Sequence, residues 1–197
     1  MASILFECDG FHVKRNTFIL KTAAFKEFHK EPVIIPFASP FLYRSRSLSK
    51  QDWRSVTCER QRKGLKWNTD GLSHSKIQET LAEQLQGAVC ILVHGEWKKK
   101  WLQDLLRPDE YPIKNLEDFG CPKVDDLGPT AGKAADNLQL LTNWIYNQSP
   151  ELQNLIFGDV NGNRKKFEIQ DSFRNTGHTK PPTILPECYE DLNLRSP

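Results

Sequence analysis

The feature that most constrains the fold of this 197-residue chain is a continuous apolar run, AVCILV, at residues 88–93. Segments with helical spacing of apolar residues lie on both sides of the run. A short strand without polar alternation is typical of a sheet that is covered on both faces. The run therefore predicts a buried strand in an α/β domain.

Amphipathic helices are expected on both sides of this strand. Ile77, Leu81 and Leu85 recur at i, i+4 and i+8 after two serines that can cap a helix, and Gly87 ends the pattern. The other elements expected in this part of the chain are helices at 96–106 and 134–146 and a short strand at 113–116.

The N-terminal third has the composition of strands. Gly10 and the pair Arg15-Asn16 supply turn signals between apolar, β-prone segments. Short links between strands predict antiparallel neighbours and thus a three-stranded meander. Its expected strands lie at 3–8, 11–14 and 17–25. Residues 32–37 contain two prolines, which fit an edge strand or a loop.

Together these elements predict the order β-β-β-α-β-α-β-α, a five-stranded mixed sheet flanked by helices. Right-handed crossovers place the strand at 88–93 beside the first strand. The order is that of the ribonuclease H-like fold, and open α/β sheets bind ligands where strand order switches. We assign residues 1–150 to this domain and 151–197 to a C-terminal extension that is largely irregular.

Composition excludes several classes of protein. The net charge is only +2, from 27 basic and 25 acidic residues, which excludes a histone-like binder that is basic throughout. No apolar run approaches the roughly 20 residues of a membrane helix, and the N-terminus lacks the basic region of a secretory signal. Five dispersed cysteines without a CxxC pair argue against zinc ribbons and disulfide scaffolds. We expect an intracellular protein, cytoplasmic or nuclear, without a membrane partner.

A local basic segment stands out against this balance. Eight lysines and arginines face only two acidic residues between Arg44 and Lys66, over a polar stretch that predicts a helix at 49–64. Arg60, Arg62 and Lys63 are candidate nucleic-acid-binding residues, because clustered cations meet phosphate. A solvated helix face has the same composition, and both interpretations are open.

A second basic motif lies in the helix expected at 96–106. Lys98, Lys99 and Lys100 are flanked by Trp97 and Trp101 and are candidates for binding phosphate, with the rings stacking on bases. The alternative is a helix whose tryptophans pack inward and whose lysines face water.

Two acidic residues lie at the end of the first expected strand. Glu7 and Asp9 are two positions apart, so they lie on the same face of a strand. Paired carboxylates are hard oxygen ligands suited to Mg²⁺ or Mn²⁺, as in two-metal nucleases. The alternative is that one faces solvent and the other has a turn role beside Gly10.

Four segments carry a resemblance to a known family: FECDGF, ILVHGEWKKKWLQDLL, NLEDFGCPKVDDL and KAADNLQLLTNW. In this order, over about residues 3–147, the chain resembles the DEDD-type 3′–5′ exonuclease branch of the ribonuclease H-like superfamily. It looks closer still to exonuclease-like domains of arthropod and transposon- or virus-linked reading frames. The resemblance implies a metal-dependent nuclease fold with a nucleic-acid partner.

The chain departs from the catalytic pattern of that family. Its first motif is Asp-x-Glu, and here Glu7 and Asp9 occupy those places in exchanged order. Lys98 stands where the second motif has an Asp that binds metal. The His and Asp of the third motif match Gly132 and Asn137, although the adjacent Asp136 can substitute if the register differs by one residue.

These departures predict a nucleic-acid-associated, exonuclease-like domain with a degraded metal site, which binds rather than cleaves. A first alternative is an active Mg²⁺- or Mn²⁺-dependent nuclease with Glu7, Asp9 and Asp136 as catalytic residues, joined by Glu117 or Asp118. A second is a protein-interaction module with a protein partner. The sequence leaves open whether the chain is an enzyme.

Overall fold

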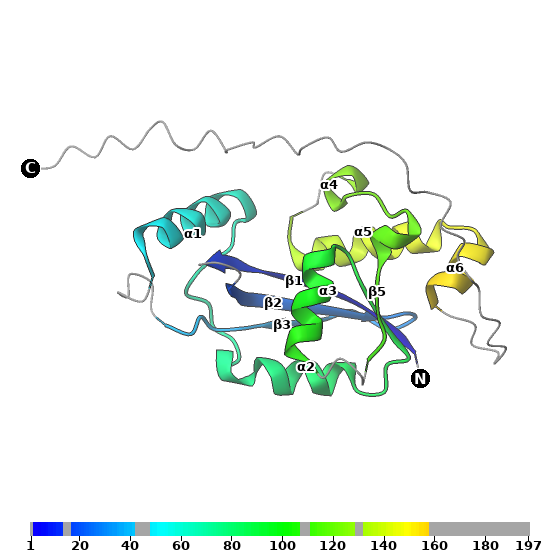
Figure 1. Cartoon of the computed structure of the whole chain (residues 1–197), viewed down its shortest axis with the longest axis horizontal. Coiled ribbons are helices and arrows are strands. Elements are labelled where there is room, and N and C mark those ends of the chain that lie inside the picture. The colour runs from blue at the N-terminus through cyan, green and yellow to red at the C-terminus, as the bar shows by residue number, and fades with distance from the viewer. Residues whose placement is uncertain (1, 14–16, 42–47, 107–110, 129–131, 158–197) are drawn as a thin grey trace, which may run out of the picture. The chain divides into compact units, whose positions relative to one another are not determined.

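The chain forms an α/β fold around a five-stranded mixed sheet (Figure 1). The computed structural model describes residues 2–13, 17–41, 48–106, 111–128 and 132–157. The sheet order is β3-β2-β1-β4-β5, with β1 antiparallel to β2, β2 antiparallel to β3, and β4 parallel to both β1 and β5. The strands are β1 (Ser3–Val13), β2 (Thr17–Glu27), β3 (Val33–Pro36), β4 (Cys90–Val93) and β5 (Ile113–Asn115). The predicted mixed sheet, with the strand at 88–93 beside the first strand, is confirmed.

Helices cover both faces of the sheet (Figure 1). Alternation along β1 sends Phe6 and Cys8 into a core with α2 and α3, whereas Leu5 packs on the other face with α5. A smaller cluster, including Phe11 and Val56, packs α1 against the far end of β1. The helices are α1 (Lys50–Lys63), α2 (Ile77–Leu85), α3 (Glu96–Leu105), α4 (Val124–Leu127), α5 (Ala134–Tyr146) and α6 (Pro150–Phe157), with 3₁₀ turns η1 (His74–Lys76) and η2 (Leu116–Phe119).

The prediction of a turn at Gly10, followed by a separate strand at 11–14, is wrong. β1 runs through Gly10 to Val13, and the irregularity lies in its partner. Asp9 pairs with Thr22 and Gly10 with Leu20, so Lys21 is an extra residue that bulges from β2. The third strand of the meander is therefore β3, at the sheet edge that the two prolines favour. The predicted turn at Arg15-Asn16 lies outside the described residues.

The second half of β1 extends beyond the end of β4. The β1–β4 ladder joins only Ser3, Ile4 and Leu5 to β4. Farther along β1, α1 takes the place of a neighbouring strand. The backbone N–H of His12 donates to Glu59 Oε2 at 3.3 Å, and Ser55 Oγ donates to the His12 carbonyl at 3.2 Å. At His12 the backbone groups on the open edge of β1 are thus satisfied by helix side chains.

Helix boundaries agree closely with the sequence pattern. The helix predicted at 134–146 is α5, and the helix predicted at 49–64 is α1, which Ser49 and Gly64 cap. The serines expected to cap the helix at 77–85 do not do so, because α2 follows the η1 turn directly, with Lys76 as its N-cap residue and no side-chain cap. α4 is not among the predicted elements. α6 begins at the expected domain boundary and buries Ile156 in the α5 core cluster. Residues 158–197 of the expected extension lie outside the described residues.

Lys114 of β5 connects the sheet to α6 through two hydrogen bonds. Its ammonium donates to the carbonyls of Leu155 and Ile156 at 3.1 and 3.0 Å, at the last turn of α6. A cation at a helix C-terminus also interacts favourably with the helix dipole. Within the part of the chain that the structure describes, no helix is long and apolar enough to cross a membrane.

Candidate functional site

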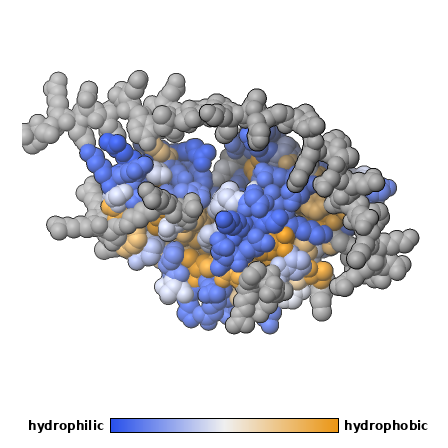
Figure 2. All heavy atoms as spheres, in the orientation of Figure 1, coloured by the Kyte–Doolittle hydropathy of each residue, from blue (hydrophilic) through white to orange (hydrophobic). Residues whose placement is uncertain are grey.

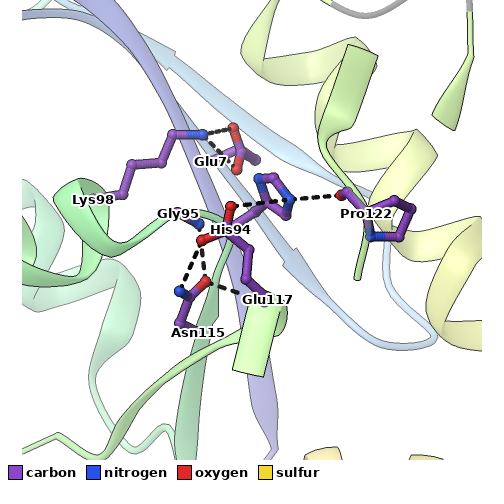
Figure 3. A network of polar contacts seen from close by, with 7 residues as sticks. All are labelled: Glu7, His94, Gly95, Lys98, Asn115, Glu117 and Pro122. Carbon is purple, nitrogen blue, oxygen red and sulfur yellow. Dashed lines mark hydrogen bonds and ion pairs between the residues drawn. The ribbon is translucent and has the colours of Figure 1, made fainter. Parts of the chain in front are cut away.

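The candidate site lies where β1 passes the end of β4. After Val93 the chain turns through His94 and Gly95 into α3, and Lys98 of this helix reaches the part of β1 that does not pair with β4. Gly95 has a φ of 101°, a backbone conformation that residues with a Cβ rarely adopt. Glu7 and Asp9 are both buried there, and Figure 3 shows Glu7 facing Lys98.

Glu7 and Lys98 form a buried ion pair. Lys98 Nζ lies 2.7 Å from Glu7 Oε1 and 2.5 Å from Oε2, so one ammonium spans both carboxylate oxygens (Figure 3). Glu7 is 0% exposed and Lys98 is 7% exposed. Burial alone lowers the pKa of Lys98, but the carboxylate of Glu7 outweighs it and raises that pKa above 10.5. Lys98 is therefore charged at neutral pH.

Asp9 has a structural partner of its own. Its Oδ2 accepts a hydrogen bond from the backbone N–H of Ala134, the first residue of α5. The N-cap residue of α5, Lys133, makes no side-chain cap, so Asp9 of β1 supplies the missing acceptor. Burial raises the pKa of Asp9, against the lowering effects of this hydrogen bond and of the Lys63 charge.

A polar network beside the pair orders the turn into α3 (Figure 3). His94 Nε2 lies 2.9 Å from the Pro122 carbonyl, which assigns the ring proton to Nε2. The Gly95 N–H donates to Asn115 Oδ1 at 2.9 Å, and Asn115 Nδ2 donates to Glu117 Oε2 at 3.1 Å. Sequence reasoning missed Asn115. Its position near the C-terminal end of the strand expected at 113–116 was the available signal.

The other carboxylates do not join Glu7 and Asp9. Asp136 is exposed on the first turn of α5, whereas its neighbour Asn137 is buried and accepts the Gly132 N–H at 2.9 Å. Asp118 is 60% exposed. Within the described residues, no three His, Cys, Asp or Glu side chains gather into a group that could hold a metal ion.

The candidate cations divide between two places. Arg60, Arg62 and Lys63 form the last turn of α1, and the charge of Lys63 acts on both Asp9 and His12. The three lysines of α3 point in different directions. Lys98 is buried, Lys99 Nζ lies 3.9 Å from Glu96 and from Asp118, and Lys100 is exposed. We define the basic end of α1 as Arg60, Arg62 and Lys63, and the charge of its last residue, Lys63, reaches Asp9 of the candidate site.

Comparison with known proteins leaves the site to be interpreted from its own geometry. No family model matches the chain, and a search of curated proteins finds no significant match.

The structural role of Asp9 gives a pH-dependent prediction. Asp9→Asn keeps an oxygen that can accept the Ala134 N–H but removes the buried charge. Because the native pKa of Asp9 is raised above 3.8, its ionisation costs stability above that native pKa, and the cost vanishes as pH falls below 3.8. Asp9→Asn is therefore expected to be at least as stable as the wild type at pH 7, with an advantage that shrinks toward pH 3.5.

Urea unfolding between pH 3.5 and 7 measures this difference, with the exposed Asp136→Asn as control. A loss of more than about 1 kcal/mol in Asp9→Asn at pH 7 would show instead that the ionised carboxylate stabilises α5 through its charge.

Proposed function

We propose that the chain is a nucleic-acid-binding domain of ribonuclease H-like, exonuclease-like architecture that does not cleave its ligand. The observation that carries the proposal is the Glu7–Lys98 ion pair. An ammonium that spans both oxygens of Glu7 occupies the place where a divalent cation would bind, and its charge repels one. The donor set therefore does not fit Mg²⁺ or Mn²⁺, and the proposal assigns neither ion.

The strand order supports the proposed relation to the ribonuclease H-like superfamily, but it does not tell whether the chain cleaves nucleic acid. Three antiparallel strands, with β4 and β5 added in parallel beside β1, give the strand order expected of that superfamily. The candidate site also lies at the switch between β1 and β4, where open α/β sheets bind ligands. Because one fold carries many functions, the proposal rests on the site rather than on this likeness.

Charge supports a nucleic-acid ligand. The basic end of α1 lies beside the end of β1, close enough for Lys63 to act on Asp9. Figure 2 shows hydrophilic residues over both α1 and α3, with a notch between them. Cations gathered at one end of a nearly neutral protein are positioned to neutralise phosphates, which makes binding sensitive to salt. As part of the proposal, the protein acts inside the cell, in keeping with four cysteines that form no disulfide: Cys8, Cys58, Cys90 and Cys121.

The test measures cleavage and binding in the same samples. Labelled single- and double-stranded DNA and RNA are incubated with the protein and Mg²⁺ or Mn²⁺, beside the Glu7→Ala/Asp9→Ala variant. We expect no cleavage by either protein, and binding that weakens as salt rises. Cleavage that is lost in the double variant would overturn the proposal in favour of an active nuclease.

Substitution of basic residues at either end of α1 tests where the nucleic acid binds. Arg62→Gln/Lys63→Gln is expected to reduce the slope of log affinity against log salt by about 1.4 for single strands, because two phosphate contacts are lost. The matched control, Lys50→Gln/Arg54→Gln, removes the same charges from the opposite end of α1 and is expected to leave the slope unchanged. Equal effects of the two variants would contradict a local site. Absence of binding to every nucleic acid would favour a protein-interaction module.

A further inference from the structure

Trp97 is a surface aromatic residue at the candidate site. It lies on the first turn of α3 and is 41% exposed, next to the buried Lys98. Lys98 Nζ lies 5.7 Å from the centre of the Trp97 ring. The two tryptophans of α3 therefore differ in role. Trp101 stacks on Phe6 of β1 with an interplanar angle of 12° and packs against the core.

Two aromatic rings contact Trp97 at steep angles. The His12 ring lies 4.9 Å away at 75°, and the Phe18 ring lies 5.1 Å away at 63°, both centroid to centroid. Among the described residues, no ring stacks parallel on Trp97. Steep contacts of this kind fix the orientation of an indole without covering it with a parallel ring.

The basic end of α1 lies beside this aromatic group. His12 joins the two, since its ring contacts Trp97 and its backbone bonds to Ser55 and Glu59 of α1. Burial lowers the pKa of His12, despite the nearby Glu59 carboxylate, so its imidazole is neutral at pH 7. Lys63 adds to this lowering, which places its charge near the aromatic group as well as near Asp9.

We infer that the ligand of this surface is a single-stranded nucleic acid, one base of which stacks on Trp97 while its phosphates contact the basic end of α1. This inference rests on the proposed function and specifies its ligand class. An exposed aromatic ring beside cations binds single strands, because every unpaired base offers a π-face. In a duplex the bases are stacked on one another and offer no free face to the ring of Trp97. Only the phosphate contacts then contribute to binding.

Fluorescence anisotropy with a labelled 12-nucleotide strand and the duplex of the same sequence tests the inference at one fixed salt concentration. We expect the single strand to bind at least tenfold more tightly than the duplex. Trp97→Ala is expected to weaken single-strand binding about tenfold and to leave duplex binding nearly unchanged. Trp97→Phe, which keeps a ring, is expected to recover most of the loss. The control is Tyr146→Ala, which removes an exposed aromatic side chain from the end of α5.

The outcomes separate this inference from the proposed function. Equal affinity for strand and duplex, or single-strand binding that Trp97→Ala leaves intact, would overturn the stacking inference while nucleic-acid binding stands. Failure of the wild type to bind any oligonucleotide would overturn both. Circular dichroism and thermal melts of each variant show that a lost affinity does not come from unfolding.

Discussion

Lys98→Met is expected to lower the free energy of unfolding by about 3–5 kcal/mol. The reason is that it leaves the carboxyl group of Glu7, which is 0% exposed, buried without its cation. Replacing both partners is expected to be far less costly. Glu7→Met/Lys98→Met removes two buried charges together, and its stability is expected to return to within about 1 kcal/mol of the wild type. Urea unfolding monitored by tryptophan fluorescence measures both.

The pH dependence gives a second readout of the pair. Because the native pKa of Lys98 is raised above 10.5, its contribution is complete below pH 10.5 and is lost as pH rises through the native pKa. The wild type is expected to lose stability in this range relative to Glu7→Met/Lys98→Met. If Lys98→Met costs less than 1 kcal/mol, or the double variant is no more stable than the single one, the pair does not hold the site together.

Gly10→Ala is the second substitution for which we expect a large loss of stability. A Cβ on Gly10 would lie 2.1 Å from the Ile19 carbonyl oxygen and 2.7 Å from the Phe18 ring. The oxygen belongs to the backbone of the bulged strand, so it cannot move aside as a side chain can. Overpacking of this kind costs about 3 kcal/mol, and thermal or urea unfolding measures it.

Gly87→Ala is the matched control. Gly87 has a φ of 74°, but no atom lies within 4 Å of an added Cβ. Only the left-handed backbone conformation opposes alanine there, at a cost of about 1–2 kcal/mol. Equal losses in the two variants would show that the close approach of β2 to Gly10 does not constrain β1.

Local periodicity was sufficient to predict most elements. The spacing of Leu138, Leu141 and Ile145 marks α5, and the unbroken run at 88–93 marks the strand that joins β1. The misplaced turn at Gly10 has a physical cause outside the first strand. The extra residue, Lys21, lies in the partner strand, so nothing in the sequence around Gly10 reveals the bulge.

The partners of the candidate site residues could not be predicted in this way. Alternation along a strand places Glu7 and Asp9 on one face. Lys98 and Ala134, however, are 91 and 125 positions away from them in the chain. Lys98 drew attention only through the family resemblance, and its contact with Glu7 depends on how far β4 extends along β1.

The side chains of α1 that bond to His12 also limit the growth of the sheet. A strand with free N–H and C=O groups is a template for pairing with another chain, and β1 projects such an edge beyond β4. Ser55 and Glu59 of α1 bond to the N–H and C=O of His12 on this edge, and a helix cannot extend the ladder to a further strand. The helix that brings cations to the candidate site thus also protects the molecule from edge-to-edge aggregation.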